Sequence, residues 1–176
     1  MKNRILFLLV EGDDDERFFQ NIIKPKLEEK YERVLIRKYA QVQNAKINKL
    51  LKSIKEMGAD YIYVVDINSA LCVTGKKKKI RNKFQNINTD KIIVVIKEIE
   101  SWYIAGLDSA RSKQFKIPVF NNTDGITKEQ FNDLIPKRFA SRIDFMIEIL
   151  NCYSTEIARQ KNKSFRYFLG KYNCEF

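Results

Sequence analysis

The chain of 176 residues contains no histidine and only three cysteines. The absence of histidine removes the commonest general base, the Ser-His and Cys-His nucleophile systems and every histidine metal site. Cys72, Cys152 and Cys174 form no CxxC pair, and their odd number argues against a disulfide framework. Any catalysis must therefore use carboxylates, Lys or Arg, hydroxyl groups or a thiol, and we predict a reducing, cytoplasmic location.

Long hydrophobic runs are also missing. The apolar segment from Ile5 to Val10 follows Lys2 and Arg4, but it is too short for an export signal and ends in the acidic segment 11–15. No later stretch reaches the roughly 18 apolar residues that a membrane-spanning helix needs. No helical segment combines a lysine-rich face with a strong apolar face. We therefore expect a soluble protein without a membrane partner.

Positive charge is in excess, because 33 Lys and Arg residues face 22 Asp and Glu residues, which leaves a net charge of +11. The chain is 44% hydrophobic, which is enough to bury a core and makes intrinsic disorder an unsuitable description. The excess is spread over the whole chain and favours a polyanionic partner such as nucleic acid or an anionic membrane surface. The alternative is a basic protein whose charge serves solubility alone.

Hydrophobic patterning predicts an α/β fold. Short apolar runs indicate buried strands, and amphipathic segments between them indicate helices. Together they are typical of a mainly parallel, Rossmann-like sheet of about four strands with helices on its faces. We divide the chain into a core, residues 1–108, and a helical C-terminal extension, residues 109–176, packed on that core. In the extension, Ser164 is the expected N-cap of a helix. The predicted strands are Ile5–Val10, Val34–Ile36, Asp60–Val65 and Lys91–Ile96.

Acidic residues follow three of the predicted strands. Glu11 comes after the first strand, Asp66 after the third, and Glu98 and Glu100 after the fourth. Ligands of parallel α/β sheets bind at the carboxyl ends of the strands, and clustered carboxylates there repel one another unless a cation neutralises them. Oxygen donors alone favour Mg²⁺ or Mn²⁺ over zinc. A purely structural explanation suits Asp13 and its acidic neighbours, because Asp13 can cap the following helix.

The ordered motifs V-E-G-x-x-D-x-x-F-F at 10–19, V-V-D-I-N at 64–68 and E-I-E-S-W at 98–102 resemble the Toprim domain. Type IA topoisomerases, DnaG-type primases and OLD-family nucleases share this domain. A family of small Toprim-like proteins with an E-x-E-x-W element and an S-F-R-x-F-L tail is the nearest likeness, and the tail here spans residues 163–169. Trp102 of the third motif is expected to pack and to orient the turn that carries Glu100.

The resemblance implies roles for individual residues. Glu11 would be the Toprim glutamate and Asp66 the first Asp of the D-x-D motif, while Asp15 and Glu100 would complete the shell of a Mg²⁺ or Mn²⁺ ion. Glu98 is a further candidate ligand. Asn68 stands where the motif has its second Asp, which removes one negative charge and lowers the expected metal affinity.

The expected function is metal-dependent cleavage of phosphodiester bonds in nucleic acid, with Glu11, Asp66, Glu100 and Lys163 as catalytic residues. The alternative is a non-catalytic protein that binds nucleic acid or a partner through a degenerate Toprim site, for which Asn68 is the evidence. An ATPase partner is implied by the likeness to OLD-family nucleases. The expected nucleic-acid contacts are a phosphate-binding loop containing Lys76, Lys77, Lys78 and Lys79, and the tail residues Arg159, Lys161 and Arg166. A solvated charge run is the alternative for the four lysines.

Overall fold

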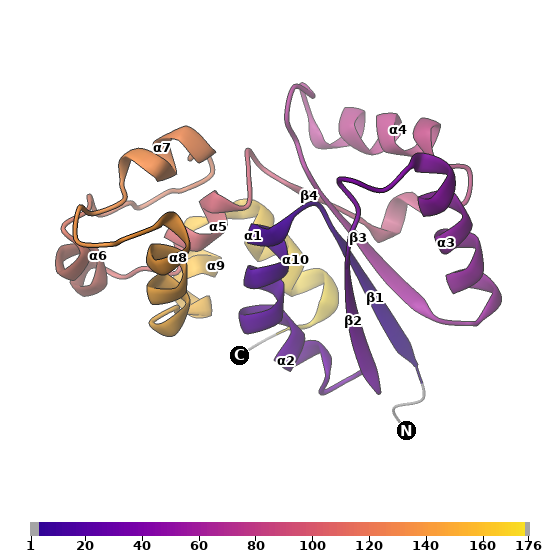
Figure 1. Ribbon diagram of the computed structural model, residues 1–176, viewed down its shortest axis with the longest axis horizontal. Coiled ribbons are helices and arrows are strands. Elements are labelled where there is room, and N and C mark those ends of the chain that lie inside the picture. The colour runs from indigo at the N-terminus through magenta and orange to yellow at the C-terminus, as the bar shows by residue number, and fades with distance from the viewer. Residues whose placement is uncertain (1–3, 175–176) are drawn as a thin grey trace. The chain divides into compact units, whose positions relative to one another are not determined.

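The computed structural model describes residues 4–174 and divides into two compact units, Met1–Val94 (unit 1) and Val95–Phe176 (unit 2). A four-stranded, all-parallel sheet has the order β2-β1-β3-β4 (Figure 1). This arrangement confirms the predicted α/β, Rossmann-like class with a helical C-terminal region. The predicted domain division after Asp108 stays a prediction, because compactness alone does not show which part folds independently. The strands are β1 (Ile5–Val10), β2 (Arg33–Lys38), β3 (Asp60–Asp66) and β4 (Ile92–Val95).

Helices cover both faces of the sheet in unit 1. Successive strand side chains point to opposite faces, so Phe7 and Leu9 of β1 pack with α3 and α4, whereas Leu6 and Leu8 lie on the other face. Figure 1 shows α1 and α2 on one side of the strands and α3 and α4 on the other. Burial of both faces explains the uninterrupted apolar strand sequences. The helical elements of unit 1 are α1 (Asp13–Phe18), η1 (Phe19–Ile23), α2 (Lys24–Leu27), α3 (Asn44–Glu56), α4 (Val73–Lys83) and η2 (Thr89–Lys91).

Unit 2 is built from short helices around an aromatic core. Trp102 packs edge-on against Phe165, with ring centroids 5.0 Å apart, and Phe131 lies 5.5 Å from Phe145. All four side chains are fully buried, which agrees with the expectation that Trp102 is a packing residue. The helices are α5 (Glu100–Ala105), α6 (Ser109–Phe115), α7 (Lys128–Asp133), α8 (Arg142–Asn151), α9 (Thr155–Lys161) and α10 (Lys163–Tyr172).

The basic segment after β3 is a helix, so the predicted phosphate-binding loop is wrong in its conformation. Cys72 caps α4 by accepting a hydrogen bond from the Gly75 backbone N–H at 3.3 Å, and Ile80 is buried against the sheet. Lysine is a good helix former, and Ile80 is the buried residue of this helix. The charge run therefore has helical geometry, which decides where each lysine points.

Two helix caps also differ from the sequence-based expectation. Helix α1 begins after Gly12 rather than after Asp13, because the Asp15 carboxylate accepts the Gly12 N–H at 3.1 Å. Helix α10 is capped by Asn162, whose side chain accepts the Phe165 N–H at 3.0 Å, while Ser164 lies inside the helix and faces the core. In α1 the stabilising side chain thus comes from inside the helix, whereas in α10 it comes from the residue before the helix.

Within residues 4–174, none of the helices has the length and apolar character needed to cross a membrane.

Candidate functional site

Glu11 and Asp66 lie at the same edge of the sheet in unit 1. Strands β1 and β3 are adjacent and parallel, and Leu9 is level with Tyr63. Glu11, two residues after Leu9, therefore comes out beside Val65 and next to Asp66, the last residue of β3. Neighbouring strands are about 4.8 Å apart, so the backbones of Glu11 and Asp66 are close neighbours at this edge. This is the carboxyl end of the strands, where the sequence analysis expects the site.

Lys76 brings a positive charge to these two carboxylates. Partial burial lowers the pKa of the Lys76 ammonium group, and the attraction of Glu11 and Asp66 opposes this shift. Lys76 lies in the first turn of α4, the helix that follows β3. A residue that the sequence analysis assigns only to nucleic-acid binding is thus within the electrostatic influence of both acids.

The helical geometry of α4 separates the four consecutive lysines. Residues three and seven positions apart share a helix face, so Lys79 and Lys83 lie on the same face as Lys76, and their positive charges further lower the pKa of Lys76. Lys77 and Lys78 project in other directions. Only part of the basic run can therefore face a ligand bound at Glu11 and Asp66.

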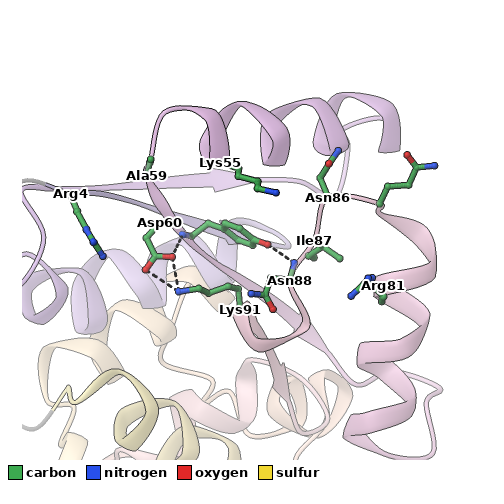
Figure 2. A pocket seen from close by; sticks show the side chains of 12 residues that line it. Arg4, Lys55, Ala59, Asp60, Arg81, Asn86, Ile87, Asn88 and Lys91 are labelled. Carbon is green, nitrogen blue, oxygen red and sulfur yellow. Dashed lines mark hydrogen bonds and ion pairs between the residues drawn. The ribbon is translucent and has the colours of Figure 1, made fainter.

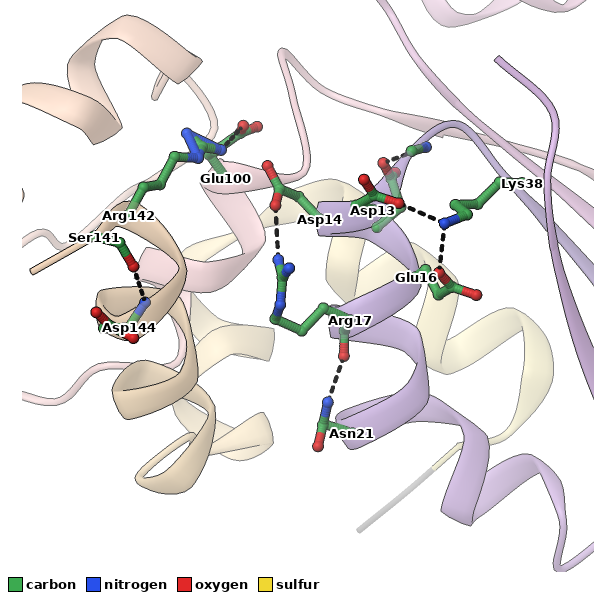
Figure 3. Close-up of polar contacts among 12 residues, drawn as sticks. Asp13, Asp14, Glu16, Arg17, Asn21, Lys38, Glu100, Ser141, Arg142 and Asp144 are labelled. Carbon is green, nitrogen blue, oxygen red and sulfur yellow. Dashed lines mark hydrogen bonds and ion pairs between the residues drawn. The ribbon is translucent and has the colours of Figure 1, made fainter. Parts of the chain in front are cut away.

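The acidic residues of α1 have different surroundings. Asp15 is buried and occupied by the Gly12 cap described above, whereas Asp13 and Glu16 both form ion pairs with Lys38, at 2.5 Å and 3.0 Å (Figure 3). Lys38 lowers the pKa of Asp13 through a hydrogen bond and charge attraction. Asp14 pairs with Arg17 at 2.7 Å. The structural explanation for Asp13 and its neighbours thus has direct support, and Asp15 is the α1 acid that lies at the helix start beside Glu11.

Asn68 lies in the turn after β3 with a positive φ of 48°. Asparagine and aspartate adopt this left-handed conformation more readily than other residues with side chains. The backbone therefore gives a reason for an Asx residue at position 68 that is independent of metal binding. Its side chain is exposed and carries a carbonyl oxygen donor.

Two tyrosines beside Glu11 are functional candidates that the sequence analysis missed. The rings of Tyr39 and Tyr63 stack 4.5 Å apart, and the Tyr39 hydroxyl donates to the Val64 carbonyl at 2.7 Å. Burial raises the pKa of Tyr63 to about 12, and the negative charge of Glu11 adds to the shift. Tyr39 follows β2 and Tyr63 lies in β3, so only the parallel pairing of the strands brings the two rings together.

In unit 2, the two predicted glutamates already have protein partners. Glu98 accepts a hydrogen bond from the Lys128 N–H at 2.5 Å and so binds the start of α7. Glu100 is buried, and its Oε1 pairs with Arg142 Nη2 at 2.5 Å (Figure 3). The Arg142 guanidinium group also lies over the Phe131 ring, 5.1 Å from its centroid. Arg142 therefore neutralises the Glu100 carboxylate, an interaction that no sequence spacing indicates.

The tail cations of unit 2 fall into two groups. Lys161 donates to the Leu107 carbonyl at 2.5 Å, and partial burial lowers its pKa. Lys163 lies 3.7 Å from Asp124 Oδ2 and also donates its backbone N–H to Asp124 at 2.7 Å. Arg159 and Arg166 are exposed. Lys161 has a structural role, whereas the two arginines are accessible to a ligand.

The donors present suit a particular kind of cation site. Considering the described residues 4–174 together, no group of three or more Asp, Glu or Cys side chains is arranged to hold a metal ion. Mg²⁺ is often bound by only one or two carboxylates and completes its coordination with water and substrate phosphates. Glu11 and Asp66 offer two hard oxygen donors at the carboxyl ends of adjacent strands. They do not form a closed, all-protein cage.

No protein-family model, curated protein or solved structure matches this chain.

Proposed function

We propose that the carboxyl end of the sheet in unit 1 is a Mg²⁺- or Mn²⁺-dependent site that cleaves phosphodiester bonds in nucleic acid. The observation that carries the proposal is that Glu11 and Asp66 lie at the carboxyl ends of two adjacent parallel strands, with the basic helix α4 following β3. The chain has no histidine, and a cation bound by carboxylates can perform this chemistry without one. The net charge of +11 supports a polyanionic substrate.

Each residue of the site has a task that follows from its chemistry. Glu11 and Asp66 would hold the cation, with Asp15 and Asn68 as further oxygen donors. When bound, the cation neutralises phosphate charge and makes a water molecule more acidic. Lys76 would bind a non-bridging phosphate oxygen through its ammonium group. In the hydrolysis, the water oxygen bonds to phosphorus, the bond to the leaving sugar oxygen breaks, and that oxygen takes up a proton.

The residues proposed from unit 2 face an additional requirement. Glu100 can act as a ligand only if its ion pair with Arg142 opens, because the carboxylate is otherwise neutralised. Lys163 is held near Asp124 at a longer distance of 3.7 Å, so its release costs less. The catalytic roles of Glu100 and Lys163, and the partner ATPase, stay predictions.

The first experiment compares Glu11→Gln with Glu32→Gln, an exposed glutamate of the same unit. Mn²⁺ binding is measured by calorimetry without nucleic acid, and cleavage is measured on labelled single- and double-stranded DNA and RNA. Loss of one carboxylate ligand should weaken Mn²⁺ binding roughly tenfold or more and abolish cleavage, whereas the control should behave like the wild type. Cleavage that needs no divalent cation, or that survives Glu11→Gln, would refute the proposal.

A second experiment tests which face of α4 contacts the nucleic acid, with two double variants of equal charge. Lys76→Gln/Lys79→Gln removes two positive charges from the face that carries Lys76. Lys77→Gln/Lys78→Gln removes two positive charges from the other sides of the helix. The first variant should lower the salt dependence of nucleic-acid affinity by roughly one to two in log–log slope, because each lysine that contacts a phosphate releases a counterion. Equal slopes for the two variants would refute the idea that nucleic acid contacts the face of α4 that carries Lys76 and Lys79.

A non-catalytic nucleic-acid-binding protein is the second candidate. It is favoured by Asn68 in place of an acid and by the lack of a three-carboxylate group among residues 4–174. In this case nucleic acid binds equally well in EDTA, and calorimetry detects no Mn²⁺ site in the wild type. The first experiment therefore separates the two candidates.

A further inference from the structure

A hollow of about 600 Å³ lies in unit 1 at the amino end of the strands, opposite Glu11 and Asp66. Arg4 precedes β1, Asp60 begins β3 and Lys91 precedes β4, so all three lie at this edge. Figure 2 shows Lys55 of α3 and Arg81 of α4 reaching toward the same space from the sides. Since β3 has seven residues, this hollow is about 20 Å from the proposed cleavage site.

The hollow has an excess of positive charge. Its single carboxylate, Asp60, is already neutralised, because Lys91 Nζ lies 2.8 Å from one oxygen and 3.1 Å from the other. The Tyr31 hydroxyl donates a further hydrogen bond to Asp60 at 3.1 Å. This leaves the three cations Arg4, Lys55 and Arg81, for which residues 4–174 provide no carboxylate partner in an ion pair. Positive charges gathered around one hollow attract an anion.

The wall of the hollow is held in place by hydrogen bonds. The backbone N–H and the side-chain amide of Asn86 both donate to Asn48 Oδ1 on α3, each at 3.1 Å. The Asn88 N–H donates to the Tyr61 hydroxyl at 2.7 Å (Figure 2). These bonds join the segment after α4 to α3 and to β3. The surface is therefore preformed, and binding a ligand costs little conformational entropy.

We propose that this hollow binds the phosphate groups of a nucleotide. A terminal phosphate carries about −1.5 to −2 and a bridging one about −1, so a diphosphate matches three unpaired cations. An internal phosphodiester brings a single charge and leaves two cations unbalanced. Arg4 and Arg81 offer forked donors for phosphate oxygens. The volume lies within the usual range for small-molecule sites and leaves space for a sugar and base beyond the phosphates.

This chemistry has two possible sources, a free nucleotide and the phosphorylated end of a nucleic-acid strand. The test uses ADP, pyrophosphate, inorganic phosphate and short oligonucleotides with or without a 5′-phosphate. Calorimetry is carried out on the full chain in EDTA. Because no divalent cation is present, the result is independent of the proposed cleavage site, and either proposal can fail alone.

The variant Lys55→Gln/Arg81→Gln removes two of the three unpaired cations. Its control, Lys46→Gln/Lys49→Gln, removes two exposed charges from α3 outside the hollow. We expect saturable 1:1 ADP binding that weakens about tenfold or more in the first variant and little in the control. Circular dichroism checks that both variants are folded, which the exposure of all four side chains favours.

The possible outcomes distinguish a free nucleotide from a strand end and show when the proposal fails. Competition with ADP by 5′-phosphorylated but not 5′-hydroxyl oligonucleotides identifies a strand end, and binding of ADP without such competition identifies a free nucleotide. The proposal is overturned by the absence of saturable ADP binding, by equal weakening in both variants, or by inorganic phosphate binding as tightly as ADP.

Discussion

Replacing Ser164 with alanine should destabilise unit 2 strongly, although the change removes only one oxygen atom. The Ser164 hydroxyl accepts the Trp102 indole N–H at 2.8 Å and the Ile96 backbone N–H at 3.2 Å, and it donates to Asn162 at 2.8 Å. Trp102, Asn162 and Ser164 are all buried. The serine of the S-F-R-x-F-L-like tail therefore satisfies the groups that connect α5, α10 and the end of β4.

The magnitude follows from the donors that lose their acceptor. A buried N–H left without a partner costs about 1 to 3 kcal/mol. The change leaves the buried Trp102 N–H and the partly buried Ile96 N–H without their acceptor. Partial relaxation or entry of a water molecule reduces the sum. We expect a loss of about 2 to 4 kcal/mol in the free energy of unfolding.

The assay is urea unfolding followed by tryptophan fluorescence. Trp102 is the single tryptophan of the chain, so its emission reports directly on unit 2 and on the network. Ser112→Ala is the control, because Ser112 is equally buried in the same unit but takes no part in this network. A loss below about 1 kcal/mol for Ser164→Ala, or one no larger than for Ser112→Ala, would refute the reasoning.

Three further predictions address the site and the packing. Asn68→Asp should increase Mn²⁺ affinity in calorimetry, because the left-handed backbone accepts Asp and a third carboxylate is added; unchanged affinity would place residue 68 outside the site. Gly106→Ala should lower the melting temperature, because the added Cβ would lie 2.2 Å from the Tyr153 ring. Gly170→Ala, a control in α10 with open space around it, should be neutral or stabilising. Equal effects of the two substitutions would contradict the close approach of Tyr153 to Gly106. Between pH 10 and 12 the unfolded chain loses the Tyr63 proton while the folded protein keeps it, so the free energy of unfolding should fall as the pH rises. Urea unfolding should show a fall about 2 kcal/mol larger in the wild type than in Tyr63→Phe. Parallel pH profiles would contradict the raised pKa of Tyr63.

The position of the acidic pair could be predicted because it depends on local patterns. Apolar runs that end in Glu11 and Asp66 indicate buried parallel strands, and parallel strands bring their carboxyl ends to one edge. The structure has both residues at that edge on adjacent strands. Their binding of a metal ion stays a prediction.

The conformation of the lysine run and the helix caps could not be predicted from local patterns alone. A run such as Lys76–Lys79 has no apolar periodicity, so nothing in it distinguishes a solvated helix from a loop, and the burial of Ile80 decides between them. Likewise, several polar residues precede α10, and the partners available in the core decide that Asn162 caps the helix while Ser164 accepts the Trp102 N–H.

Composition and short periodic patterns were enough to predict the class of fold, the absence of histidine chemistry, the basic charge and the placement of carboxylates after buried strands. Three features emerged from the folded chain alone: the influence of Glu11 and Asp66 on Lys76, the ion pair of Arg142 with Glu100, and the cations that line a hollow at the amino end of the sheet. Each of these features involves side chains from different segments of the chain. Charges that folding brings together attract one another through space, and no spacing in the sequence indicates this attraction.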